Sequence, residues 1–244
     1  MLDTLLVLLA ALLGGALNAL AGGGSFLTLP ALMLAGVPPV MANATGTLAL
    51  LPGYVASCFG YRQELGELRR SRPLPTMLLV SLTGGVAGAT LLLLTPDALF
   101  RALVPWLLLL ATLLFLFAPR LTAGGQSSHP GLLLPGVFLV SVYGGYFNGG
   151  MGILLMALLA LVGGVGVQGD NAAKNLLSAV LTLVAVSVYV LGGQVVWSLA
   201  WPMMLAGLAG GYAGALWGRR LPPPVLRSII VLTGAAMTVL FFVF

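Results

Sequence analysis

The sequence predicts an all-α polytopic membrane protein made of two inverted repeats, each of about five helical segments that include a short hairpin broken by glycines. Three observations predict this fold class. Of the 244 residues, 60% are hydrophobic and 6% are charged, whereas charged residues make up about 25% of a soluble domain. The apolar residues form stretches of about 20 residues, the length of a membrane-spanning helix. Glycine-rich motifs also recur in both halves.

Breaks in hydropathy place the segments in order. The first repeat, residues 1–121, is expected to hold segments at residues 5–21, 26–35, 40–59, 74–94 and 98–118. Residues 122–130 form a linker. The second repeat, residues 131–244, is expected to hold segments at residues 132–147, 151–162, 171–191, 196–216 and 225–244. Because no basic residue precedes the first segment, we interpret it as a membrane helix rather than a cleaved signal peptide.

Three motif pairs relate the repeats. Gly14–Asn18 matches Gly144–Asn148 at a shift of 130, Asn43–Thr47 matches Asn171–Asn175 at a shift of 128, and Gly84–Ala89 matches Gly210–Ala215 at a shift of 126. Basic loops favour the cytoplasm, which places the loops Arg62–Arg72 and Arg219–Arg220 inside. The turn at Gly192, the equivalent of the first loop, then lies outside. We therefore expect inverted repeats in a multi-pass protein of the plasma (inner) membrane, with both termini outside.

Each repeat is interrupted at two corresponding places. The first is Gly22–Ser25 in one repeat and Asn148–Gly150 in the other, and the second is the start of the following helix, at Asn43–Thr47 and Asp170–Asn175. A broken helix exposes unpaired N–H groups, which hydrocarbon cannot satisfy and which attract anions. The candidate substrate-binding residues are therefore Gly22, Gly23, Gly24, Ser25, Asn43, Thr45, Thr47, Asn148, Asn171, Lys174 and Asn175.

Lys174 is expected about one turn inside a helix that starts near Asp170 or Asn171. There it either faces an anion, extends to the membrane interface, or pairs with Asp170. Asp170 is predicted to cap the helix rather than to carry a proton. Asn18 and Asn148 either belong to the site or join helices. The spaced glycines of the fourth and ninth segments, among them Gly84, Gly88, Gly207, Gly210 and Gly214, are expected to let helices pack closely.

Several functions are disfavoured by composition. The sequence holds one cysteine, Cys58, and one histidine, His129, too few for a Cys/His metal cluster or a Ser/His/Asp triad. We therefore expect no metal, no cofactor and no enzymatic activity. The net charge of +5 comes from arginines in short loops, which argues against nucleic-acid binding. The expected partners are a small anionic substrate and the lipid bilayer, and a homodimer is left open.

Three stretches near the N-terminus resemble the sulfite exporter TauE/SafE family, also called TSUP or probable membrane transporter proteins. They are Gly22–Pro30, Leu34–Pro39 and Ala42–Thr47. The family pattern is a Gly-rich turn, Phe, a proline, a short apolar helix, a Gly-x-Pro turn and a Gly-Thr-Ser helix start, of which Gly46-Thr47-Leu48 keeps Gly-Thr and loses the Ser. The second half departs from it, with Ala173-Lys174-Asn175 where Gly-Thr-Ser is expected. The resemblance implies a plasma-membrane transporter for sulfite, sulfoacetate, another sulfonate or a related organic anion.

The leading hypothesis is a secondary transporter that binds a small anion at broken-helix N-termini between the repeats and works by alternating access. The alternative is a channel-like passive facilitator for a small solute, favoured by the near-absence of carboxylates in the apolar segments. A membrane enzyme or an assembly subunit is the third hypothesis, disfavoured because no catalytic constellation can be assembled and because a scaffold does not need polar breaks in both halves.

Overall fold

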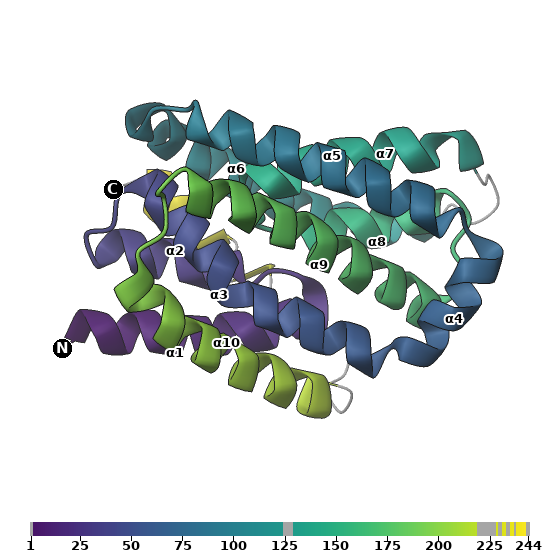
Figure 1. Cartoon of the computed structure of the whole chain (residues 1–244), viewed down its shortest axis with the longest axis horizontal. Helices are drawn as coiled ribbons and strands as arrows, with labels where there is room; N and C mark the ends of the chain where they lie inside the picture. Colours follow the sequence, from purple (N-terminus) through teal and green to yellow (C-terminus); the bar gives the residue numbers. More distant parts are fainter. Residues whose placement is uncertain are drawn as a thin grey trace.

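The computed structural model describes residues 2–123 and 129–218, and residues 228, 231–232, 235–236 and 238–242. Within these residues the regular structure is helical, which confirms the predicted all-α class (Figure 1). The helices are α1 (Leu2–Ala21), α2 (Ser25–Leu34), α3 (Pro39–Gly60), α4 (Arg62–Ser71), α5 (Leu74–Leu93), α6 (Asp97–Ala123), α7 (Leu133–Tyr146), α8 (Met151–Leu161), α9 (Val167–Leu191) and α10 (Trp197–Gly218). A single 3-10 turn, Pro130–Leu132, leads into α7.

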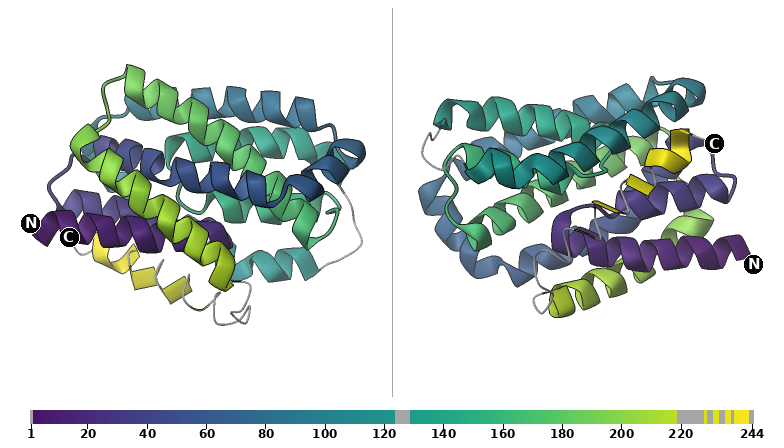
Figure 2. Two further views of the ribbon diagram at one scale, coloured as in Figure 1. Left: turned by 60° about the horizontal axis from the view of Figure 1, so that its bottom comes forward. Right: turned by 180° about the vertical axis from the view of Figure 1, so that it is seen from behind.

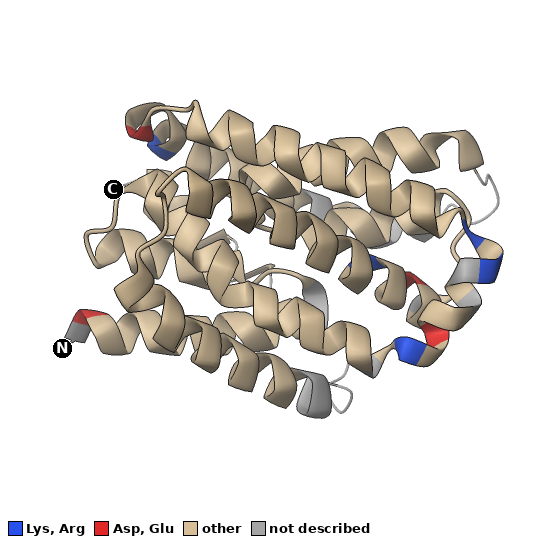
Figure 3. Cartoon of the chain, viewed as in Figure 1, with Lys and Arg blue, Asp and Glu red and all other residues tan. Residues whose placement is uncertain are grey.

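The distribution of polar side chains is that of a membrane protein. Leucines such as Leu79 and Leu205 are 62% and 71% exposed, whereas Asn43 and Asn175 are buried. Most of the described charged residues lie at the two ends of the bundle (Figure 3). Among the described residues, α5 and residues Gln168–Leu191 of α9 are long and apolar enough to cross a bilayer. The helices α2 and α8, with 10 and 11 residues, are too short to span it alone.

The helices form two groups that do not follow the sequence halves. In the first group α10 lies along α1 and α3, and in the second α5 lies along α7 and α9 (Figures 1 and 2). The central helices α3 and α9 pack against each other and run in opposite directions, because Arg72 bonds Gly163 at one end and Thr45 bonds Val196 at the other. Each half therefore gives one long helix to the group built mainly by the other half.

The close contacts of one group recur in the other. A Cβ on Gly210 would meet the carbonyl oxygen of Leu12, and a Cβ on Gly84 would meet that of Phe138. In both comparisons the residue numbers differ by 126. Two more pairs repeat the pattern, Gly214 with Ala16 and Gly88 with Val142. The prediction that these glycines allow close helix packing is therefore confirmed.

The same contacts correct one predicted alignment. The match of Gly14–Asn18 with Gly144–Asn148 at a shift of 130 is wrong by four residues, about one helical turn. Contacts of α1 and α7 repeat at a shift of 126, so Asn148 corresponds to Gly22, and both have positive φ, 61° and 80°. The sequence comparison failed because the pair Gly14–Gly15 lies about one turn earlier in its repeat than the pair Gly144–Gly145 does in the other.

Two segment boundaries also differ from the prediction. The basic stretch Arg62–Arg72 is not a loop, because residues Arg62–Ser71 form the helix α4. Leu65 and Leu68, three residues apart, pack into the same core cluster as Tyr54, and this contact holds α4 against the bundle. Helix α9 starts at Val167, four residues before the predicted segment. Arg219–Arg220 and most of the predicted last segment lie outside the described residues.

Candidate functional site

The two glycine-containing breaks meet inside the bundle. The α1–α2 break contacts the start of α8, because a Cβ on Gly22 would lie 2.7 Å from the Cα of Gly152. The α7–α8 break in turn lies near α2, because a Cβ on Gly150 would lie 3.5 Å from the Phe26 ring. Both Gly22 and Gly150 have positive φ, 80° and 74°, which glycine adopts without strain. The two breaks therefore meet in the interior of the bundle.

The start of each short helix holds backbone N–H groups that the structure leaves without an acceptor. Among the described residues these include the N–H groups of Gly23, Gly24 and Ser25 before α2, and those of Gly150 and Gly152 at α8. A helix N-terminus carries partial positive charge, equivalent to roughly half an elementary charge. Two such ends in contact repel each other, and an anion between them would remove the repulsion.

Asn148 gives the place where the two breaks meet, here called the junction, an unpaired polar side chain. It is 1% exposed, and neither its Oδ1 nor its Nδ2 has a hydrogen-bond partner among the described residues. Its backbone is left-handed, with φ of 61°. The neighbouring carbonyl of Gly149 is fixed by the Tyr143 hydroxyl, which donates to it at 2.7 Å. An unpaired buried amide costs about 1–3 kcal/mol, so a ligand or water is expected to contact Asn148.

One face of α3 turns toward the junction. Asn43 Nδ2 donates to the Tyr146 carbonyl at 3.1 Å, and Leu50 lies against Gly24. Thr47 lies between Asn43 and Leu50 on the same face, because residues three and four apart share a helix face. Its buried hydroxyl has no partner. Thr47 therefore presents an unpaired hydroxyl between the two breaks.

A polar stripe on α9 contains Lys174. The residues Asp170, Lys174, Ser178 and Thr182 recur every four positions and so share a face, and all are buried. The hydroxyls of Ser178 and Thr182 and the Oδ1 of the adjacent Asn175 have no partner. Ser178, Thr182 and Thr28, whose hydroxyl is also unpaired, were not among the predicted site residues. The four-residue spacing on α9 is the signal that could have identified the first two.

Lys174 differs from its predicted surroundings. Because α9 starts at Val167, Lys174 lies two turns inside the helix rather than one. The side chain is 1% exposed, so it does not extend to the surface, and within the described residues it forms no ion pair with Asp170. The Asp170 carboxylate instead accepts a hydrogen bond from the N–H of Val165 at 3.1 Å. Asp170 is therefore not the N-cap, a position held by Gly166, but it does fix the loop before α9.

Other candidate residues form hydrogen bonds away from the junction or are less deeply buried. The Thr45 hydroxyl accepts a hydrogen bond from the Val196 N–H at 3.0 Å, which fixes the turn before α10, away from the junction. Asn171 is half-buried, and Ser25 is buried at the start of α2. Asn18 accepts a hydrogen bond from the Tyr54 hydroxyl at 3.0 Å and thereby joins α1 to α3. Of the two asparagines compared in the sequence, Asn18 joins helices and Asn148 is unpaired.

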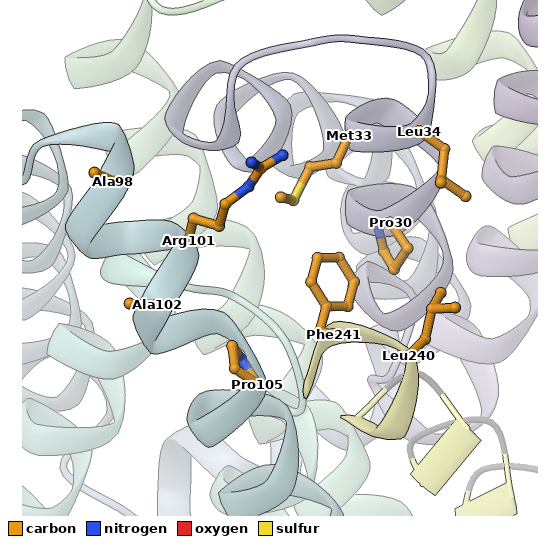
Figure 4. Close-up of a pocket in the computed structure, with 9 residues that line it drawn as sticks. All are labelled: Pro30, Met33, Leu34, Ala98, Arg101, Ala102, Pro105, Leu240 and Phe241. Carbon is orange, nitrogen blue, oxygen red and sulfur yellow. The ribbon is translucent and has the colours of Figure 1, made fainter. Parts of the chain in front are cut away.

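A separate hollow opens between α2 and α6. It has a volume of about 530 Å³, and its walls are apolar except for Arg101 (Figure 4). In the close-up, Met33, Leu34 and Pro30 face Arg101 and Pro105 across this space. Because only one polar side chain lines it, this hollow does not match an anion site built from helix N-termini. Arg101 is exposed, in agreement with a position at the membrane interface.

Helices that break in the interior of an apolar bundle, with polar groups gathered at the breaks, define a polytopic membrane protein of the transporter class. A model of the family "Sulfite exporter TauE/SafE" matches residues 7–241. The chain belongs to this family.

Curated relatives carry transporter names. The chain is similar to the "Probable membrane transporter protein" of Haemophilus influenzae, with 29% identity over 91% of this chain and 88% of the relative. It is similar to the "Probable membrane transporter protein ORF9" of a Sinorhizobium species, with 28% identity over 94% and 88%. It is also similar to the "Probable membrane transporter protein YfcA" of Escherichia coli K12, with 28% identity over 93% and 85%. The chain is thus a membrane transporter by family.

Proposed function

We propose that this protein is a secondary transporter for a small anion, such as sulfite, sulfoacetate or another sulfonate. The anion binds where α2 and α8 begin, between the two groups of helices. The observation that carries this proposal is the contact of the α1–α2 break with the start of α8, at Gly22 and Gly152, next to the unpaired amide of Asn148. Free N–H groups and a neutral amide donor suit an oxyanion better than a cation or an apolar solute.

The substrate class draws on two further features. The family that matches the chain is described as a sulfite exporter family, and a sulfonate or sulfite group offers several acceptor oxygens at once. Thr47 on α3 adds an unpaired hydroxyl, which can donate a hydrogen bond to such an oxygen. Lys174 supplies a positive charge for the anion.

Alternating access then follows from a shift of one helix group relative to the other. The antiparallel course of α3 and α9 supports inverted repeats, and the basic helix α4 lies on the cytoplasmic side of the plasma (inner) membrane. Both termini then lie outside. The moving bodies are the groups around α3 and α9 rather than the two sequence halves, because α10 packs on α1 and α5 packs on α7.

The direct test uses the purified protein in two steps. Thermal unfolding is measured with sulfite, sulfate, thiosulfate, sulfoacetate, taurine and simple carboxylates, because a ligand that binds the folded state raises the unfolding temperature. The stabilising anion is then used for flux and counterflow in proteoliposomes. Saturable flux with counterflow supports a transporter, whereas flux that neither saturates nor shows counterflow supports the passive facilitator. Unchanged anion affinity in Lys174→Ala would refute the role of the lysine charge.

A further inference from the structure

The lysine and the described arginines of this chain occupy different kinds of position. Of its ten lysines and arginines, only Lys174 is a lysine. The described arginines Arg62, Arg70, Arg72 and Arg101 lie near helix ends, whereas Lys174 lies two turns inside α9 and is 1% exposed. Arginine remains charged in proteins, whereas a buried lysine readily gives up its proton. The enclosed cation is thus the one that can become neutral.

The described residues around Lys174 offer it no fixed counter-charge. Within the described part of the chain no hydrogen bond and no ion pair reaches its ammonium group. A lone charge inside a membrane protein is costly unless it pairs or loses its proton. Asp170, one turn away, is already bonded to the Val165 N–H. With no anion to pair with, Lys174 can avoid this cost by releasing its proton.

The elements packed against α9 add few groups that could change this. The described part of α5 and α8 contains no ionisable side chain, α7 contributes Tyr143 and Tyr146, and α3 contributes Tyr54 and Cys58. The amphipathic α4 contributes Arg62, Glu64, Glu67, Arg69 and Arg70, followed by Arg72. Arg72 donates to the Gly163 carbonyl at the end of the bundle. The nearest acid along α9 is Asp170, one helical turn before Lys174.

The face of α9 that bears Lys174 differs from the corresponding face of α3. The α3 and α9 contacts repeat at a shift of 128, since Gly207 meets the carbonyl of Ala49 and Ser81 bonds the carbonyl of Leu177. Lys174 and Ser178 therefore correspond to Gly46 and Leu50. In the first repeat Thr28 lies against Gly46 and Leu50 against Gly24, which fills the space. In the second repeat a lysine and an unpaired hydroxyl occupy these positions.

We propose that Lys174 carries the proton that accompanies the anion. This inference rests on the proposed function. In the empty protein Lys174 is a neutral amine. A proton from the open aqueous side binds its nitrogen lone pair as the anion binds along Lys174 and Ser178, and both are released to the other side. One proton moves with each anion, so a monovalent anion is transported without net charge and a divalent anion with one negative charge.

The single lysine makes its charge directly measurable. The protein is produced with ¹³C-labelled lysine and reconstituted in nanodiscs, where one lysine Cε signal reports the charge of Lys174. Without anion, this signal is expected to show a neutral amine at about pH 8, where an exposed lysine is charged. Addition of the anion found by thermal unfolding, with sulfoacetate as first probe, is expected to convert it to the charged form.

Each outcome of this measurement is decisive. A charged Lys174 in the empty protein overturns the proposal even if an anion binds. A neutral signal that a bound anion does not change overturns it as well. If none of the tested anions raises the unfolding temperature, both the proposed function and this inference fail, and that failure appears in the binding assay rather than in the lysine signal.

A transport measurement with Lys174→Arg separates charge from proton transfer. In proteoliposomes, an inward proton gradient is expected to drive accumulation of the anion by the unmodified protein. Lys174→Arg, which keeps the charge but does not release it, is expected to bind the anion and to lose the response to the gradient. Lys174→Met is expected to weaken binding at least about tenfold, the equivalent of 1.4 kcal/mol. A gradient response retained in Lys174→Arg would contradict the proposal.

Discussion

Gly22 and Gly152 pack backbone against backbone, so a Cβ on Gly22 would lie 2.7 Å from the Cα of Gly152. This contact brings together the α1–α2 break and the start of α8, which come from different halves of the chain. Only a residue without a side chain fits at Gly22, and its φ of 80° favours glycine as well.

The first prediction concerns this contact. Gly22→Ala is expected to lower the free energy of unfolding by about 2 kcal/mol or more, because it combines an overpacked interior with a left-handed alanine. The measurement is thermal unfolding in detergent. Gly66→Ala is the control, since a Cβ on Gly66 meets no atom within 4 Å. Equal stability of the two variants would show that the breaks are not in contact.

The second prediction separates the backbone of Asn148 from its amide. Asn148→Gly keeps the left-handed backbone and removes an unpaired buried group, so stability is expected to stay the same or rise. Anion affinity is expected to fall at least about tenfold, because a hydrogen bond to a charged ligand contributes about 1.5–3 kcal/mol. Asn148→Ala also removes the amide but strains the backbone by about 1–2 kcal/mol. Undiminished affinity in both variants would exclude Asn148 from the site.

A third prediction exchanges side chains between the repeats. Ser178→Leu places in the second repeat the residue that Leu50 provides in the first, and it is expected to keep the fold while abolishing anion-induced stabilisation. Leu50→Ser is expected to destabilise the protein by about 2–4 kcal/mol, because it removes packing against Gly24 and buries a hydroxyl. Thermal unfolding with and without anion gives both results. Anion binding retained by Ser178→Leu would place the ligand elsewhere.

The fourth prediction tests a contact between helices at one end of the bundle. The Asp97 carboxylate, in the first turn of α6, accepts a hydrogen bond from the Val40 N–H at 2.9 Å and so caps α3. Asp97→Ala is expected to cost about 1 kcal/mol of stability, as loss of a helix cap does. Asp3→Ala serves as the control, since Asp3 is exposed at the start of α1. An effect no larger than that of the control would show that this cap does not stabilise α3.

The sequence predicted the helical segments, their breaks and the close packing of the glycines, because hydropathy and glycine spacing are local signals. It did not identify α4 as a helix, since the apolar face of α4 is only Leu65 and Leu68 within a charged stretch. The roles of Asn18 and Asn148 could not be told apart, because they depend on whether a tyrosine from another helix, Tyr54, lies within reach. Ser178 and Thr182 were missed because their importance follows from the absence of hydrogen-bond partners in the fold.

The exchange of long helices between the halves has a consequence for biogenesis. When the ribosome has finished α6, the helices α7 and α10 have not yet been made. The faces of α1 and α5 that pack against them through the glycine contacts are therefore still uncovered. The N-terminal half therefore sits in the membrane as an incomplete intermediate until translation nears its end. Separately expressed halves should each be short-lived, and they should survive only when produced together in the same cell.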